Sequence, residues 1–223
     1  MKKFEQELAD VKRRVMEMGA LAEQMVAWSS DALVKRDRAI VAEVLAAEDK
    51  LDRFQIEIDS EAIRLITIYT PTAKDLRFLL MVVRINTELE RIGDQAVNIA
   101  ESVLILIPQP PLKPLIDIPR MALIAENMIR DALDAFVKKD AELAREVLRR
   151  DDEVDELKDQ VFRELLTYMM ADPGTIQRAL SLILISRNLE RIGDHATNIA
   201  EDVIFIAEAK DVRHHAEQHG SRS

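Results

Sequence analysis

The chain has 223 residues, of which 48% are apolar and 32% are charged, and its formal net charge is −10 at pH 7. This length suits one large domain or two small ones, and the apolar content suffices for a packed core. The acidic balance argues against nucleic acid as a partner and against direct binding to anionic lipid. With only 5 Gly and 4% aromatic residues, the composition favours an all-α fold.

The composition also limits where the protein works and which metal ligands it can offer. No apolar run approaches the about 20 residues that a bilayer-spanning helix needs, and the charged start of the chain does not resemble a signal peptide, so we expect a cytoplasmic protein. The absence of Cys excludes disulfides and thiolate ligands. Three of the 4 His lie in segment 211–223, which we expect to be a disordered tail. A metal site in the remaining chain must therefore be rich in oxygen ligands.

The first half of the chain predicts three long helices. Apolar residues recur at steps of three and four over 2–35, which is the pattern of an amphipathic helix. A second such pattern runs over 38–69 and stops at Thr70 and Pro71, because proline disfavours helix in the residue before it. The third predicted helix covers 72–107. The next segment, 108–119, contains most of the prolines and predicts a linker.

The second half predicts the same three-helix pattern, with helices over 118–138, 140–171 and 174–209. Residues 89–103 and 189–203 are identical at 12 of 15 aligned positions, at an offset of 100. Residues 77–88 and 177–188, just upstream, match only at two leucine and isoleucine positions. The chain is therefore predicted to be an internal duplication of two tandem three-helix bundles, 1–107 and 120–210, joined by the Pro-rich linker 108–119.

The repeated segment carries polar side chains along one face of its helix. At about 100° per residue, the four oxygen-bearing side chains of each copy fall within an arc of roughly 80°. The apolar positions of the segment lie on the other side, so we expect these two acidic stripes to face solvent or a groove. The first acidic stripe is Glu90, Asp94, Asn98 and Glu101, and the second is Glu190, Asp194, Asn198 and Glu201.

The second helix of each copy carries a matching pair of acids four residues apart. These are Glu48 and Asp52 in the first copy, and Asp151 and Asp155 in the second. With 41 acids in the chain, each pair taken alone is more often a solvated helix face than a site. The stripes are stronger evidence, because a solvated face does not require the same four residues in both copies. Like charges four residues apart repel, and a multivalent cation turns that repulsion into coordination.

Three further aligned positions, 91/191, 93/193 and 95/195, lie within the repeated segment beside the stripes. Gly93 and Gly193 lie in mid-helix, where glycine costs about 1 kcal/mol relative to alanine, so we expect a neighbouring helix to approach closely there. Arg91 and its counterpart in the second copy are predicted to form surface ion pairs with acids of the second helix. His195 stands where the first copy has Gln95, so an imidazole is at most an optional ligand.

Taken together, the two repeats, their acid-x3-acid pairs and the segments LERIGDQAVNIAE and LERIGDHATNIAE closely resemble the PhoU family over essentially the whole chain. The resemblance implies a non-enzymatic cytoplasmic regulator, often dimeric, that restrains phosphate uptake and the phosphate-starvation response. Its implied partners are the ATPase subunit of a phosphate ABC transporter and the sensor histidine kinase PhoR, with only indirect membrane association. It further implies bound metal ions, iron or zinc first and manganese or magnesium as alternatives. The implied metal ligands are Glu48, Asp52, Glu90, Asp94, Asp151, Asp155, Glu190 and Asp194, with Asn98, Glu101, Asn198 and Glu201 as additional candidates.

Two other functions compete with this interpretation. A metal-free helical adaptor would use the stripes to dock a basic partner. A carboxylate-bridged di-iron enzyme would require Glu-x-x-His motifs that point into the bundle, and neither Glu90 nor Glu190 is followed by such a histidine. The residues therefore favour a binding protein over an enzyme, and leave open whether the stripes bind metal or protein.

Overall fold

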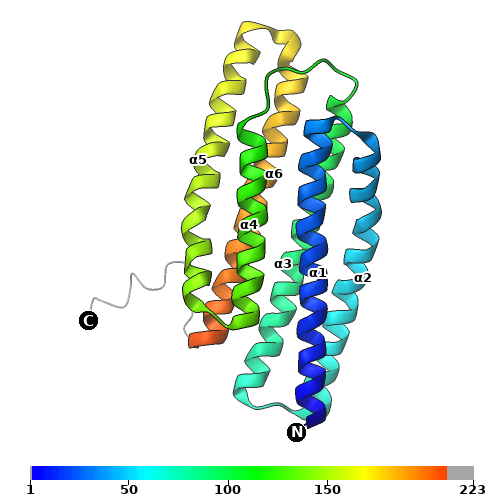
Figure 1. Ribbon diagram of the computed structural model, residues 1–223, viewed down its shortest axis with the longest axis vertical. Helices are drawn as coiled ribbons and strands as arrows, with labels where there is room; N and C mark the ends of the chain where they lie inside the picture. The colour runs from blue at the N-terminus through cyan, green and yellow to red at the C-terminus, as the bar shows by residue number, and fades with distance from the viewer. Residues whose placement is uncertain (1, 210–223) are drawn as a thin grey trace, which may run out of the picture.

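A computed structural model describes residues 2–209, and within them every regular element is helical (Figure 1). The all-α prediction is thus confirmed for this part of the chain, and the segment 211–223 lies outside it. The predicted starts at 72, 118, 140 and 174 lie within two residues of the observed ones, and the last differs because a short 3₁₀ turn, Pro173–Thr175, precedes that helix. The helices are α1 (Lys2–Lys35), α2 (Arg38–Tyr69), α3 (Ala73–Leu106), α4 (Asp117–Lys138), α5 (Ala141–Ala171) and α6 (Ile176–Glu208).

Local sequence explains where the second helix of each repeat begins and ends. Asp37 and Asp140 are N-caps whose carboxylates accept hydrogen bonds from backbone amides of the first turns of α2 and α5. Thr70 closes α2 in the left-handed conformation, with φ of 43°, directly before Pro71. The predicted stop of this helix at Thr70 is therefore confirmed.

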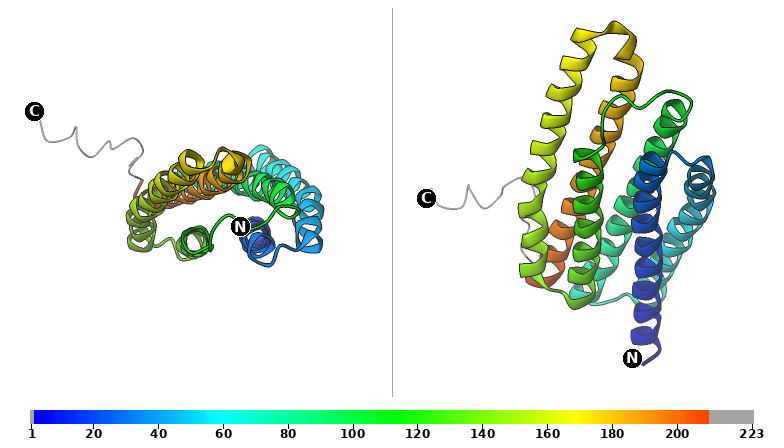
Figure 2. Two further views of the ribbon diagram at one scale, coloured as in Figure 1. Left: turned by 90° about the horizontal axis from the view of Figure 1, so that it is seen from above. Right: turned by 45° about the horizontal axis from the view of Figure 1, so that its top comes forward.

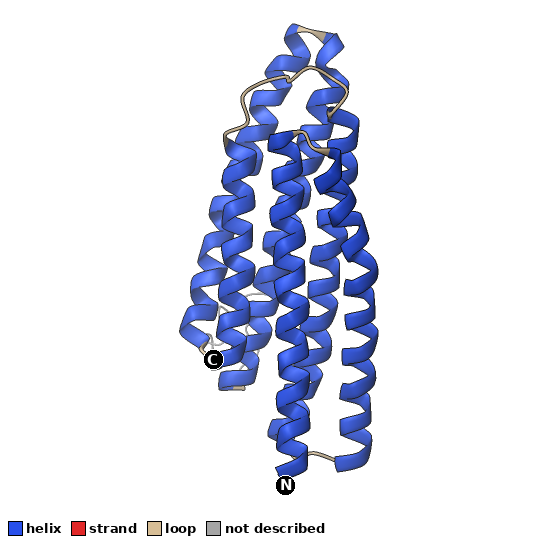
Figure 3. Ribbon diagram, turned by 45° about the vertical axis from the view of Figure 1, so that its right-hand side comes forward, coloured by secondary structure: helices blue, strands red, loops and turns tan. Residues whose placement is uncertain are grey.

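The six helices form two packed layers (Figure 2). Helices α2, α3, α6 and α5 lie side by side in that order as a curved layer, and α1 and α4 pack against its concave side. All connections lie at the two ends of the bundle (Figure 3). Helices α3 and α6 occupy the middle of the curved layer and pack against each other along their length. The two repeats consequently share one continuous apolar core, to which all six helices contribute.

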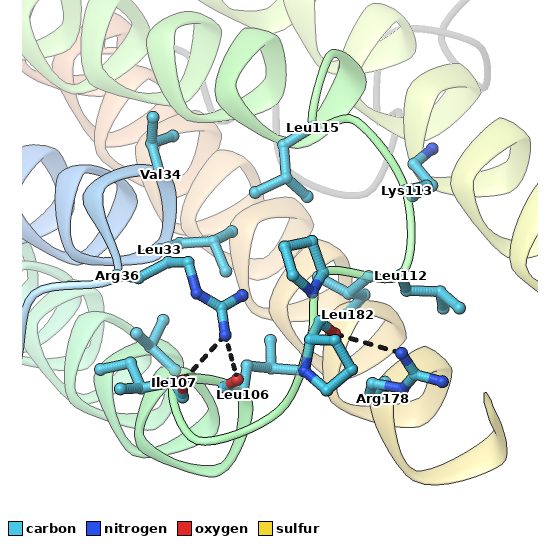
Figure 4. A pocket seen from close by; sticks show the side chains of 13 residues that line it. Leu33, Val34, Arg36, Leu106, Ile107, Leu112, Lys113, Leu115, Arg178 and Leu182 are labelled. Atoms are coloured by element: carbon cyan, nitrogen blue, oxygen red, sulfur yellow. Dashed lines mark hydrogen bonds between the residues drawn. The ribbon is translucent and has the colours of Figure 1, made fainter. Parts of the chain in front are cut away.

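Two arginines from different repeats hold the linker in place (Figure 4). Arg36, between α1 and α2, donates hydrogen bonds to the carbonyls of Leu106 and Ile107 at 2.8 Å each, and to that of Gln109. Arg178 of α6 donates to the carbonyl of Pro110 at 3.1 Å. A cavity of about 250 Å³ lies between these groups and is lined mainly by leucines and prolines. Since both guanidinium groups are bonded to the chain itself, the cavity is best understood as part of the linker's packing.

The close approach predicted at the mid-helix glycines is confirmed. A Cβ atom added at Gly93 would overlap Cδ2 of Leu51 on α2, and one added at Gly193 would lie 3.3 Å from Oδ1 of Asp151 on α5. The glycines therefore let α2 approach α3 and α5 approach α6. Among the described residues, no helix is long and apolar enough to cross a membrane.

Candidate functional site

Four carboxylates of the first repeat gather where α2 faces α3, and we call them the first cluster: Glu48, Asp52, Glu90 and Asp94. Burial raises the pKa of Glu48, and the charges of Asp52 and Asp94 raise it further. The pKa values of Glu90 and Asp94 are also raised, first by burial and then by neighbouring carboxylates that include Asp52. The structure thus brings together the acid pair of the second helix and the stripe of the third.

The second cluster is the matching group between α5 and α6: Asp151, Asp155, Glu190 and Asp194. Burial, followed by the charges of Asp194 and Asp155, raises the pKa of Asp151 to about 6. Burial also raises the pKa of Asp194, and Glu190 and Asp155 add to the effect. Unlike the first cluster, this one contains a cation. Lys158 of α5 lies 3.1 Å from Asp155 and 3.4 Å from Glu190.

The remaining polar residues of the stripes occupy different surroundings in the two repeats. Asn98 and Glu101 are exposed, and the charge of Glu101 contributes to the raised pKa of Glu48. Asn198 is partly buried and donates a hydrogen bond to Glu88 at 3.0 Å. Glu201 is partly exposed. The prediction that the stripes face away from the core holds for all eight positions, since none of them is fully buried.

A polar contact joins the two repeats between the clusters. Glu88 of α3 lies 2.7 Å from Nδ1 of His195 on α6, which donates a hydrogen bond to it when that nitrogen carries the proton. Burial raises the pKa of Glu88, but the hydrogen bonds from His195 and Asn198 outweigh it and the net shift is downward. The charge of His195 acts on Glu90 and Asp94 of the first cluster and on Asp194 of the second. The two clusters therefore lie on either side of the contact between α3 and α6.

One sequence prediction about these side chains is wrong. Arg91 was expected to pair with an acid of the second helix, but it lies 3.5 Å from Glu88 on its own helix. The spacing explains the difference, because residues three apart on a helix are neighbours. Glu88 was not singled out in the sequence, since the second copy has Asn188 in its place and comparing the repeats hides it. Lys158 was hidden for the same reason, as its counterpart is Gln55.

The chemistry of the clusters is that of a cation site made of oxygen ligands. Neighbouring carboxylates repel one another when they are charged, and this repulsion raises their pKa values. A bound cation relieves it. Within residues 2–209, no three acidic or histidine side chains are placed closely enough to hold a metal ion as they stand. The ligand atoms are therefore of the type that a metal ion binds, but their present positions are too far apart. Binding a metal ion would require side-chain rotations on the two facing helices.

Fold and clusters together define a duplicated six-helix protein that presents carboxylates at equivalent positions of both repeats. The chain belongs to the PhoU family, whose domain model matches residues 15–103 and again 118–203. The family resemblance noted in the sequence is thus confirmed.

Similar proteins extend this relationship over the whole chain. A Caulobacter vibrioides protein is 43% identical over 92% of this chain and 90% of its own length. An Aquifex aeolicus protein is 39% identical over 96% of this chain and 96% of its own length. Both proteins are named "phosphate-specific transport system accessory protein PhoU homolog". The crystal structure of PhoU from Pseudomonas aeruginosa covers 93% of this chain and 100% of its own, with a TM-score of 0.90 and 36% identity. The regulatory protein PhoU from Streptococcus pneumoniae, 24% identical with a TM-score of 0.87, shares the fold.

Proposed function

We propose that the chain is an accessory protein of a phosphate-specific transport system that restrains phosphate uptake and the two-component response to phosphate starvation. The observation that carries this proposal is the similarity to proteins named as accessory proteins of a phosphate-specific transport system, which spans both repeats and nine-tenths or more of each chain. The names of these relatives describe accessory or regulatory proteins of phosphate transport, and they mention no catalysed reaction. We therefore propose a non-enzymatic mode of action through protein contacts.

The proposed partners are the ATPase subunit of the phosphate ABC transporter and the sensor histidine kinase PhoR, met at the cytoplasmic side of the membrane. A net charge of −10 supports contacts with basic protein surfaces rather than with nucleic acid or anionic lipid. Membrane association is then indirect, through the transporter. We further propose that the protein acts as a homodimer.

Metal binding at the two clusters is the second part of the proposal. Glu48, Asp52, Glu90 and Asp94 would hold the metal in the first repeat. Their carboxylates are crowded and partly desolvated, and a cation would offset both costs. Carboxylate oxygens accept iron and zinc, which the family resemblance favours, and equally manganese and magnesium. In the second repeat the ligands would be Asp151, Asp155, Glu190 and Asp194.

Phosphate uptake by a deletion strain tests the regulatory role. In phosphate-rich medium, loss of the protein should raise phosphate uptake and switch on starvation-response genes, because the restraint on both is gone. Uptake of radiolabelled phosphate and a reporter of a starvation promoter measure the two effects, and re-expression of the wild-type chain is the control. Unchanged uptake together with normal promoter activity in the deletion strain would refute the proposed role.

Chelation tests the metal role and separates it from the metal-free adaptor. Metal bound only to the folded state raises the melting temperature, so EDTA should lower it by several degrees in protein purified without chelator. The double variant Asp94→Asn, Asp194→Asn should melt at the same temperature with and without EDTA, and elemental analysis should find its metal content reduced. Identical melting of the wild-type protein with and without EDTA, combined with no bound metal, would favour the adaptor.

A further inference from the structure

The two clusters have the same acids but differ in one cation. Lys158 follows Asp155 by three residues on α5 and extends toward α6, where it reaches Glu190. Its Nζ atom lies 3.1 Å from Asp155 and 3.4 Å from Glu190, so the ammonium group bridges the two walls of the second cluster. It also lies 3.7 Å from the more exposed Asp159. The ammonium group of Lys158 thus already lies between the facing carboxylates of Asp155 and Glu190.

The first cluster has no equivalent group. The residue three positions after Asp52 is Gln55, which is neutral. Arg91, whose charge acts on Glu90 and Asp94, forms its ion pair with Glu88 instead. Within the described part of the chain, no Lys or Arg lies at ion-pair distance from the four carboxylates of this cluster. Their mutual repulsion is consequently not offset by a bound side-chain cation.

We propose that Lys158 serves as a built-in counter-ion of the second cluster, so that a divalent metal ion binds the first cluster preferentially and binds the second only by displacing this lysine. The proposal rests on the metal binding put forward above. A metal ion entering the second cluster must break two ion pairs before it can use Asp155 and Glu190, whereas the first cluster offers its carboxylates unpaired. Lys158 is therefore a specificity-determining residue for metal occupancy.

Calorimetric titration of metal-free full-length protein with Mn²⁺ tests the inference. Wild-type protein should show a tight and a weaker class of site. Asp94→Asn should remove the tight class and Asp194→Asn the weak one. Lys158→Gln, which installs the residue of the first repeat, should tighten the weak class by roughly fivefold to tenfold, since the competing ion pairs are removed. The reverse change, Gln55→Lys, should weaken the tight class by a similar factor.

Thermal melting supplies a readout that does not depend on fitting two classes of site. Without metal, Lys158→Gln should melt below wild type, because the carboxylates of the second cluster lose their counter-ion. Addition of Mn²⁺ should raise its melting temperature more than that of wild type. The matched control is Lys138→Gln on α4, which removes a lysine charge that pairs with Asp134 and should leave both Mn²⁺ classes unchanged.

The possible failures have different meanings. Equal Mn²⁺ affinity at both clusters of wild type, unaltered by Lys158→Gln in the Asp94→Asn background, would overturn the role of Lys158 and leave the proposed metal function standing. Absence of Mn²⁺ binding in wild type and in Lys158→Gln alike would overturn both.

Discussion

The two mid-helix glycines look equivalent in the sequence but make room for different neighbours. Gly93 accommodates Leu51, a fully buried side chain of the core between α2 and α3. Gly193 instead faces the carboxylate of Asp151, with Met128 and Val154 at ordinary contact distance. One glycine therefore serves core packing, and the other leaves space for a member of the second cluster.

This difference predicts unequal effects of the same substitution. Gly93→Ala should destabilise the fold by about 1–3 kcal/mol, because the added methyl group overlaps Leu51 in a packed core and this cost exceeds the gain in helix propensity. Gly193→Ala should be near neutral, since the helix-propensity gain of about 1 kcal/mol offsets a milder contact. Urea unfolding of both variants measures the free energies. The explanation fails if Gly93→Ala proves as stable as wild type.

At the scale of elements, the linker is held by side chains rather than by regular structure. The guanidinium group of Arg36 donates to three carbonyls at the end of α3 and beyond it. Such carbonyls at a helix C-terminus have no partner within the helix. The start of the connection between the repeats is therefore bonded to a residue located between α1 and α2, while Arg178 of α6 holds the linker at Pro110.

Arg36→Ala should accordingly lower the free energy of unfolding by about 1–3 kcal/mol, the cost of removing the donor from the carbonyls of Ile107 and Gln109, whereas Leu106 keeps the backbone amide of Gln109. It should also speed proteolytic cleavage within 107–116, which limited proteolysis with mass spectrometry can locate. Arg163→Ala, at an exposed position on α5, is the control and should behave as wild type. Unaltered cleavage in Arg36→Ala would show that the hydrogen bonds of Arg36 are not needed to hold the linker.

The helices themselves were accessible to sequence reasoning because their signals are local. Proline at Pro71, the proline cluster after Leu106 and the apolar steps of three and four located the ends of nearly every helix. The start of α6 was less well predicted. The residues just before it, Pro173–Thr175, form a 3₁₀ turn, and Asp172 accepts a hydrogen bond from the amide of Gly174, a detail that periodicity does not reveal.

At the scale of the whole molecule, acids also meet where the repeats join through α1 and α4. Burial raises the pKa of Glu126 on α4 to about 6, and the charge of Glu23 on α1 adds to the effect, while Arg130 opposes it. Arg130 forms an ion pair with Glu23 across the same contact. A carboxyl group whose folded-state pKa is raised favours folding when protonated, so its contribution is lost as pH rises from about 4.5 to about 6.

Glu126→Gln should therefore stabilise the protein at pH 7–8 by about 1 kcal/mol, after allowing for partial solvation of the site, and should give little change near pH 4. The reason is that glutamine stays neutral where the buried carboxylate must ionise. Urea unfolding from pH 4 to pH 8 measures the difference, with Glu43→Gln on the exposed face of α2 as the control. A variant less stable than wild type at pH 8 would show that Glu126 is favourably paired when charged.

The sequence by itself determined the helical class, the duplication and the eight acids of the two clusters, because these depend on periodicity, proline positions and identity between the repeats. Only the tertiary structure decided which neighbours the acids have. The side-by-side packing of α3 and α6 placed Glu88 against His195, and the approach of α5 to α6 placed Lys158 between Asp155 and Glu190. The contacts Glu88–His195 and Lys158–Glu190 join residues that are far apart in the chain and differ between the repeats, so local patterns carry no signal for them.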